Sequence, residues 1–89
     1  MNEVNFIDRR ISDKDIESFG FGDSMADGTA IIIEDNWLMA HVMHAARIFP
    51  SVSEARKNGW NKPIPKGMSE FIVGKRKTRI WILGELDNG

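Results

Sequence analysis

The sequence predicts a small α+β domain with one central helix, a short second helix and a small antiparallel sheet that includes a C-terminal hairpin. The chain has 89 residues, which is enough for one domain, and its hydrophobic content of 42% is enough for a packed core. Apolar residues recur at helical spacing in the middle of the chain, whereas residues 78–83 alternate as in a strand. We expect a single domain over residues 1–89, with an acidic segment at 1–35, a basic part at 36–83 and a flexible tail at 84–89.

The first third of the chain contains weak strand signals and one clear helix start. Residues 4–11 alternate weakly, which predicts an edge strand or an extended arm. Ser12 precedes several acidic residues, as an N-cap does, and Gly20 is suited to end the short helix that follows. The glycines of residues 20–29 predict a loop, and residues 29–33 predict a buried strand.

The middle of the chain predicts the two other helices. We expect a helix over residues 36–49 that Asp35 or Asn36 caps. The apolar residues of this segment have helical spacing, and the helix must end before Pro50, because a proline disfavours helical geometry in the residue ahead of it. Ser51 and Glu54 fit a capping box, which predicts a short second helix that residues 58–59 terminate.

The last third predicts a loop and a hairpin. The prolines of residues 60–67 indicate a loop or an extended crossing. Residues 71–73 and 78–83 are strand signals, and residues 74–77 separate them as a turn. Trp81 lies in the second strand, and we expect it to pack in the core, as aromatic residues in small sheets usually do.

Charge is distributed unevenly along the chain. The formal net charge is −1, but residues 1–46 have a net charge of −6 and residues 47–83 have a net charge of +7. Such a division produces a dipolar surface that steers association with charged partners. The alternative is that the two halves attract each other within the fold.

Composition excludes several classes of site. The chain has no cysteine, so disulfides, thiolate zinc sites and cysteine nucleophiles are excluded. We therefore expect a cytoplasmic protein. The N-terminal residues lack the pattern of a signal peptide, and no strictly apolar run is longer than that of Ala30–Ile33, which is too short to span a membrane.

Candidate metal and catalytic residues are weak. Residues 23–34 have the length of an EF-hand loop, but Met25 and Ile31 stand at its third and ninth positions and supply no side-chain oxygen. His41 and His44 share a helical face without a third strong ligand at helical spacing, so partly buried structural histidines are the expected interpretation. Ser24 and Ser53 lack the surroundings of an activated nucleophile. We expect no metal, no cofactor and no catalytic activity.

One motif resembles a known family. An apolar helix ends at Pro50, the segment 53–57 reads Ser-Glu-Ala-Arg-Lys, and residues 74–77 read Gly-Lys-Arg-Lys before the last strand. This part, residues 38–83, resembles the S4-type RNA-binding domain found in a ribosomal protein, pseudouridine synthases and bacterial tyrosyl-tRNA synthetases. The resemblance implies that Arg56, Lys57 and the cations of residues 75–77 face RNA phosphates.

The sequence therefore predicts a non-catalytic nucleic-acid-binding module, with RNA as the expected partner. Cations on a hairpin tip reach phosphates, and Trp60 is placed to stack on a base. The predicted contact residues are Arg56, Lys57, Trp60, Lys62, Lys66, Lys75, Arg76, Lys77 and Arg79. One alternative is that the basic run is a solvated loop that protects a sheet edge. Another is a small protein–protein adaptor or inhibitor, such as a phage-type regulator, that docks on a host protein; a homodimer is also compatible with the sequence.

Overall fold

The computed structural model describes residues 3–86, which form four helices and a four-stranded sheet. The strands are β1 (Glu3–Asp8), β2 (Ile31–Ile33), β3 (Met68–Val73) and β4 (Thr78–Leu83). The helices are α1 (Asp13–Ser18), α2 (Gly22–Ala26), α3 (Met39–Ala45) and α4 (Val52–Ala55), and a π-type turn at Arg56–Trp60 follows α4. The α+β class predicted from the sequence is confirmed, as are the C-terminal hairpin and the strand at β2.

The sheet is mixed, whereas the sequence predicted an antiparallel one. The strand order is β2-β1-β4-β3, with β1 parallel to both β2 and β4, and with β3 antiparallel to β4. The prediction of an edge strand or arm at residues 4–11 is therefore wrong, because β1 lies inside the sheet. Phe6 is in register with Ile31 on one side and with Ile82 on the other.

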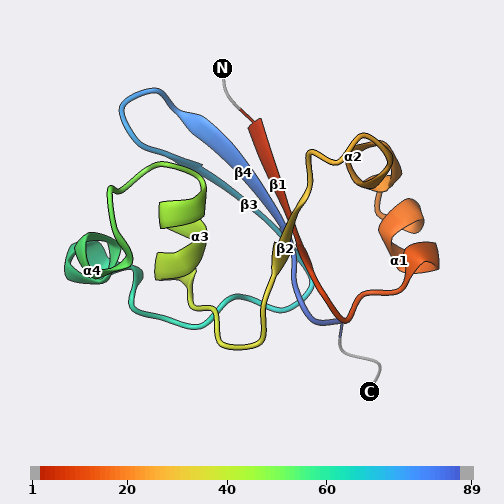
Figure 1. Ribbon diagram of the computed structural model, residues 1–89, viewed down its shortest axis with the longest axis horizontal. Helices are drawn as coiled ribbons and strands as arrows, with labels where there is room; N and C mark the ends of the chain where they lie inside the picture. The colour runs from red at the N-terminus through yellow and green to blue at the C-terminus, as the bar shows by residue number, and fades with distance from the viewer. Residues whose placement is uncertain (1–2, 87–89) are drawn as a thin grey trace.

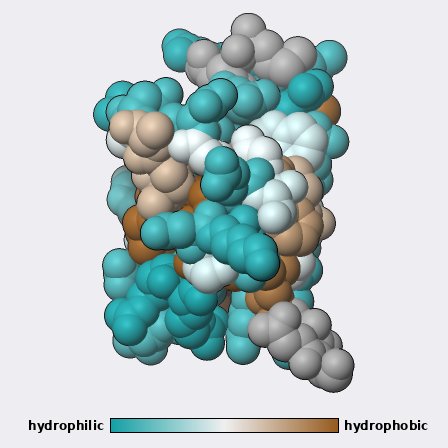
Figure 2. Space-filling model, turned by 90° about the vertical axis from the view of Figure 1, so that its right-hand side faces the viewer, coloured by the Kyte–Doolittle hydropathy of each residue, from teal (hydrophilic) through white to brown (hydrophobic). Residues whose placement is uncertain are grey.

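Helices cover both faces of the sheet. Figure 1 shows α3 and α4 on one side of the strands and α1 and α2 on the other. On the first side, Phe6 and Ile80 are fully buried in a cluster that includes Met43 of α3. On the second side, Ile7 of β1 packs with Ile16 of α1. The outer surface over α1 and α2 is mostly hydrophilic at its centre, with hydrophobic residues at both flanks (Figure 2).

Local sequence signals located several helix ends correctly. The Ser12 hydroxyl accepts a hydrogen bond from the Asp15 amide at 3.2 Å, and the Ser51 hydroxyl accepts one from the Glu54 amide at 3.1 Å. These are N-cap contacts, which satisfy amides that have no partner within the helix. Helical backbone continues past α4 into the π-type turn and breaks at Asn58 and Gly59, where Gly59 has a φ of 94°; residues 58–59 are the predicted terminator.

The predicted loop at residues 20–29 and the predicted start of the central helix are wrong. Residues 20–29 contain α2, because the buried Phe21 anchors a helical turn despite the flanking glycines. The central helix does not begin at Asp35 or Asn36. Leu38 is extended and pairs with Pro63, and the Met39 amide donates to the Lys62 carbonyl at 2.9 Å. The segment 60–67, which crosses from the π-type turn to β3, therefore pairs with the residues just before α3. As a result the helix begins later in the sequence than predicted.

The first part of the predicted flexible tail is held in place. Gly84 is buried, and its amide donates to the Gly67 carbonyl at 2.8 Å. The Gly67 amide in turn donates to the Glu85 carbonyl at 3.0 Å. Residues 87–89 of the predicted tail lie outside the described residues. Within residues 3–86, no helix combines the length and the apolar character required to cross a membrane.

A buried carboxylate at the end of β1 provides a test of the fold. Asp8 is almost fully buried, and the Arg10 guanidinium donates to both of its oxygens, at 3.0 and 3.1 Å. This hydrogen bonding holds the pKa of Asp8 below its ordinary value of 3.8. The stabilisation from the ionised form is therefore fully present above that value and is lost as the pH falls through the lowered pKa.

Asp8→Asn is expected to lower the free energy of unfolding by about 1–3 kcal/mol at pH 7, because it weakens charge-assisted hydrogen bonds at a buried site. The difference from the unmodified protein should shrink in acid, where Asp8 becomes protonated. Urea unfolding at about pH 7 and about pH 2 measures both values. Asp23→Asn, at an exposed position, is the control. A difference that stays constant between the two pH values would contradict the assignment to Asp8.

Candidate functional site

A pocket of 490 Å³ lies at the end of the sheet where β3 turns into β4. We call it the hairpin-end pocket. Its apolar lining comes from three separate parts of the chain: Ile48 and Phe49 after α3, Trp60 after α4, and Val73 at the end of β3. All four side chains are half-buried and pack against the main core. The pocket therefore depends on tertiary packing and not on one segment alone.

Three cations line the same pocket. Lys75 and Arg76 belong to the hairpin turn, and Arg47 follows α3. All three are exposed, and none makes an ion pair with any described residue. Arg47 and Arg76 also line a neighbouring pocket of 440 Å³, whose lining includes the acidic residue Glu3. The arrangement combines an apolar interior with positive charge that is available to an anion.

Arg47 has an unusual backbone conformation that the sequence analysis missed. Its φ is 64°, in the left-handed region that favours glycine. The Arg47 amide donates to the His44 carbonyl and the Ile48 amide donates to the Met43 carbonyl, both at 2.9 Å. These two bonds form a Schellman motif, in which the position of Arg47 is most often glycine. The motif ends α3 before the predicted limit at residue 49, and turns Ile48 into the pocket.

Contacts on two sides hold Trp60 in place. Its ring meets Phe71 of β3 edge-on, with centroids 6.1 Å apart and an interplanar angle of 81°. The Lys62 ammonium lies 4.9 Å from the centroid of the Trp60 ring, within the range of a cation–π interaction. Trp60 and Lys62, two of the predicted contact residues, thus lie together. Trp81 packs against the cluster on the opposite side of the sheet, as expected.

The other predicted contact residues are dispersed. Lys57 pairs with Glu54 at 3.8 Å, and Arg56 lies beside it in the π-type turn; neither lines the hairpin-end pocket. Arg79 forms an ion pair with Glu70 at 3.1 Å. Because successive side chains of a strand point to opposite faces, Arg79 lies on the face of β4 opposite to that of Thr78 and Ile80.

Lys66 lies at the opposite end of the sheet, in a pocket lined by several acidic residues: Asp8, Glu34, Asp35 and Glu85. Lys77 is exposed in the hairpin turn beside Arg76. Of the nine predicted residues, the structure therefore brings three into one pocket: Trp60, Lys75 and Arg76. Lys62 lies beside Trp60, and Lys77 follows Arg76 in the hairpin turn.

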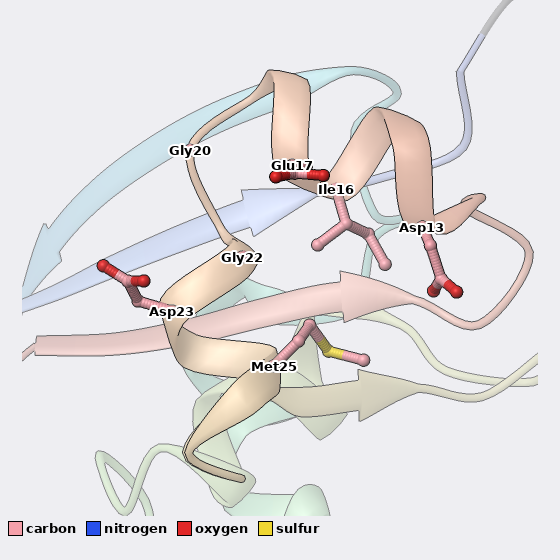
Figure 3. A pocket seen from close by; sticks show the side chains of 7 residues that line it. All are labelled: Asp13, Ile16, Glu17, Gly20, Gly22, Asp23 and Met25. Carbon is pink, nitrogen blue, oxygen red and sulfur yellow. The ribbon is translucent and has the colours of Figure 1, made fainter.

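A second hollow of 470 Å³ lies between α1 and α2 and carries the opposite charge. Asp13, Glu17 and Asp23 line it together with Ile16 and Met25. Figure 3 shows that the carboxylates of Asp13 and Asp23 lie at its two ends and do not point toward a common centre. Among residues 3–86, no group of three histidine or carboxylate side chains is arranged to hold a metal ion.

The residues considered as metal ligands have local structural contacts. His41 accepts a hydrogen bond from the Leu38 amide at 2.9 Å and stacks on Trp37, so it caps the start of α3. His44 is exposed, contrary to the expectation of partial burial, and its Nδ1 lies 3.1 Å from the Phe49 carbonyl oxygen. Asp27, from the EF-hand-like segment, accepts hydrogen bonds from the amide and hydroxyl of Thr29.

Comparison with protein-family models, with curated proteins and with solved structures finds no match to this chain.

Proposed function

We propose that this chain is a non-catalytic nucleic-acid-binding module that contacts RNA through the hairpin end of the sheet. One observation carries the proposal: Arg47, Lys75 and Arg76 line an apolar pocket that also contains Trp60. Nucleic acids combine closely spaced negative charges with flat bases, so a binding surface for them needs cations next to an aromatic side chain. The absence of cysteine also leads us to propose a cytoplasmic protein.

The pairing of charges leaves the cations at this end of the sheet available to a polyanion. Arg9, Arg10, Lys57 and Arg79 are each close to a carboxylate, at 3.0–3.9 Å. By contrast, Arg47 and the turn residues 75–77 form no ion pair within the described part of the chain. Exposed cations without partners release counterions from a bound polyanion and do not first have to break an internal pair.

The resemblance of residues 38–83 to the S4-type domain is the reason for preferring RNA to DNA. It implies that Arg56, Lys57 and the turn cations face phosphates. Trp60 ends the π-type turn that contains Arg56 and Lys57, and it lines the pocket together with Lys75. In this proposal, Arg56 and Lys57 extend the contact beyond the pocket, and Lys66 makes no contact because it lies at the other end.

A salt titration tests the proposal directly. Fluorescently labelled structured RNA, single-stranded RNA and duplex DNA are each titrated at about 50 and about 200 mM salt. Four phosphate contacts, from Arg47 and residues 75–77, predict that single-stranded RNA loses affinity by about 50-fold over this range. Lack of binding to all three probes at the lower salt concentration would overturn the proposal.

The alternative function is a protein–protein adaptor or inhibitor of the phage-regulator type, and one feature favours it. β3 is an edge strand, and its outer face exposes two apolar side chains, Met68 at 44% and Ile72 at 52%. Exposed strands with apolar side chains pair readily with other chains, including a second copy. Failure to bind nucleic acid in the titration, together with β3-dependent association, would favour this alternative.

A further inference from the structure

We infer that the hairpin-end pocket binds one unstacked base of a single-stranded RNA, while the cations at its rim hold the phosphates on either side. The inference rests on the proposed function and goes further, because it specifies single strands and a base-inserted mode. It follows from the shape and chemistry of the pocket, from the fixed position of Trp60 and from the conformation of Arg47.

The pocket suits a base better than a duplex. Its 490 Å³ lies within the range of small-molecule pockets, and Phe49, Trp60 and Val73 give it an apolar lining. A base in a duplex is stacked and paired, whereas a base in a single strand can unstack from its neighbours and enter a pocket. Cations at the rim then lie where the phosphates of the inserted nucleotide must pass.

Trp60 is positioned before any ligand binds. The edge-on contact with Phe71 and the packing of the half-buried ring against the main core restrict its side chain. A fixed aromatic ring loses little conformational entropy when a base stacks on it. The apolar lining of the pocket is therefore preorganised for a flat ligand.

Arg47 supplies the most specific observation. It occupies the glycine-favouring position of a Schellman motif, with a φ of 64°, and it lines both the hairpin-end pocket and its neighbour. A left-handed arginine destabilises the fold relative to glycine at the same position. Backbone strain of this kind is a feature of functional sites. Glycine at this position would relieve the strain but would remove the cationic side chain from the rim of the pocket. We assign to Arg47 the phosphate next to the inserted base.

The first test uses the unmodified protein, so it does not depend on whether a variant folds. A labelled single-stranded RNA of about ten nucleotides is compared with the same strand carrying abasic positions and with the strand annealed to its complement. The full strand is expected to bind about 10-fold more tightly than either comparison strand, because stacking of one base contributes that much. Equal affinity for all three would overturn the base-inserted mode and leave the proposed function standing. No salt-dependent binding to any of them would overturn both.

The second test uses a pair of variants at residue 47. Arg47→Gly is expected to raise the thermal unfolding midpoint by about 4 °C and to weaken binding of the same strand by about 5-fold. Arg47→Lys keeps the charge and the left-handed backbone, so it should retain most of the affinity without the gain in stability. Because stability and affinity move in opposite directions in Arg47→Gly, partial unfolding cannot explain a loss of binding. Unchanged affinity in Arg47→Gly would overturn the role assigned to Arg47.

Discussion

Replacement of Lys75, Arg76 and Lys77 by glutamate is expected to weaken RNA binding by a factor of about 100 or more. Each of these exposed side chains loses an attraction to phosphate of about 1 kcal/mol, and the new carboxylates add repulsion. The salt dependence should become shallower as well, because fewer counterions are released when fewer phosphates are neutralised. Fluorescence anisotropy of a labelled single-stranded RNA at about 50 mM salt measures the change.

The triple variant needs controls for folding and for net charge. The three residues are exposed and form no ion pair within residues 3–86, so the urea unfolding midpoint should change little. Arg76→Glu and Lys14→Glu form a matched pair, because each lowers the net charge by the same amount while Lys14 lies on α1, across the sheet. If Lys14→Glu weakened binding as much as Arg76→Glu, overall charge and not the hairpin end would govern the interaction.

Local signals in the sequence predicted the elements that local interactions determine. A serine followed by acidic residues located the start of α1, and Ser51 located the start of α4. The alternation of residues 78–83 and the basic turn before them located the hairpin, whose two strands are neighbours in the sequence. In each case the residues that make the contact are only a few positions apart, so a short stretch of sequence contains the whole interaction.

Non-local pairing limited the rest of the prediction. The start of α3 depends on the crossing segment, which supplies the Lys62 carbonyl to Met39 and pairs Pro63 with Leu38. Nothing within residues 34–39 contains that information. The parallel pairing of β1 with β2 and β4 also joins segments that are distant in the sequence, and a parallel arrangement leaves no turn signature.

The candidate site was partly predictable for the same reason. Lys75 and Arg76 were identified because they are consecutive in a turn, and Trp60 because a tryptophan beside a basic segment suggests stacking. Arg47 fell within the last turn of the helix predicted over residues 36–49, because a left-handed arginine has no sequence signature comparable to that of glycine. The nearby Pro50 indicates that a helix must end, but not at which residue.

The position of β1 has the largest expected consequence for stability. Phe6 is fully buried in the centre of β1 and packs with residues from both neighbouring strands and from α3. Phe6→Ala is expected to lower the free energy of unfolding by about 3–5 kcal/mol, because it removes a large apolar side chain and leaves a cavity. For a domain with a total stability of about 5–15 kcal/mol, this is a large fraction. Urea unfolding followed by circular dichroism measures the change.

Phe19→Ala is the matched control, because it removes the same atoms from a position at the end of α1 where the residue is 39% exposed. We expect it to cost about 1 kcal/mol or less. If residues 4–11 were an extended arm, Phe6 would be largely solvated and both variants would unfold at similar urea concentrations. A large difference between them requires β1 to be packed into the core of the domain. Because Phe6 does not line the hairpin-end pocket, its loss should weaken RNA binding only when the whole domain unfolds.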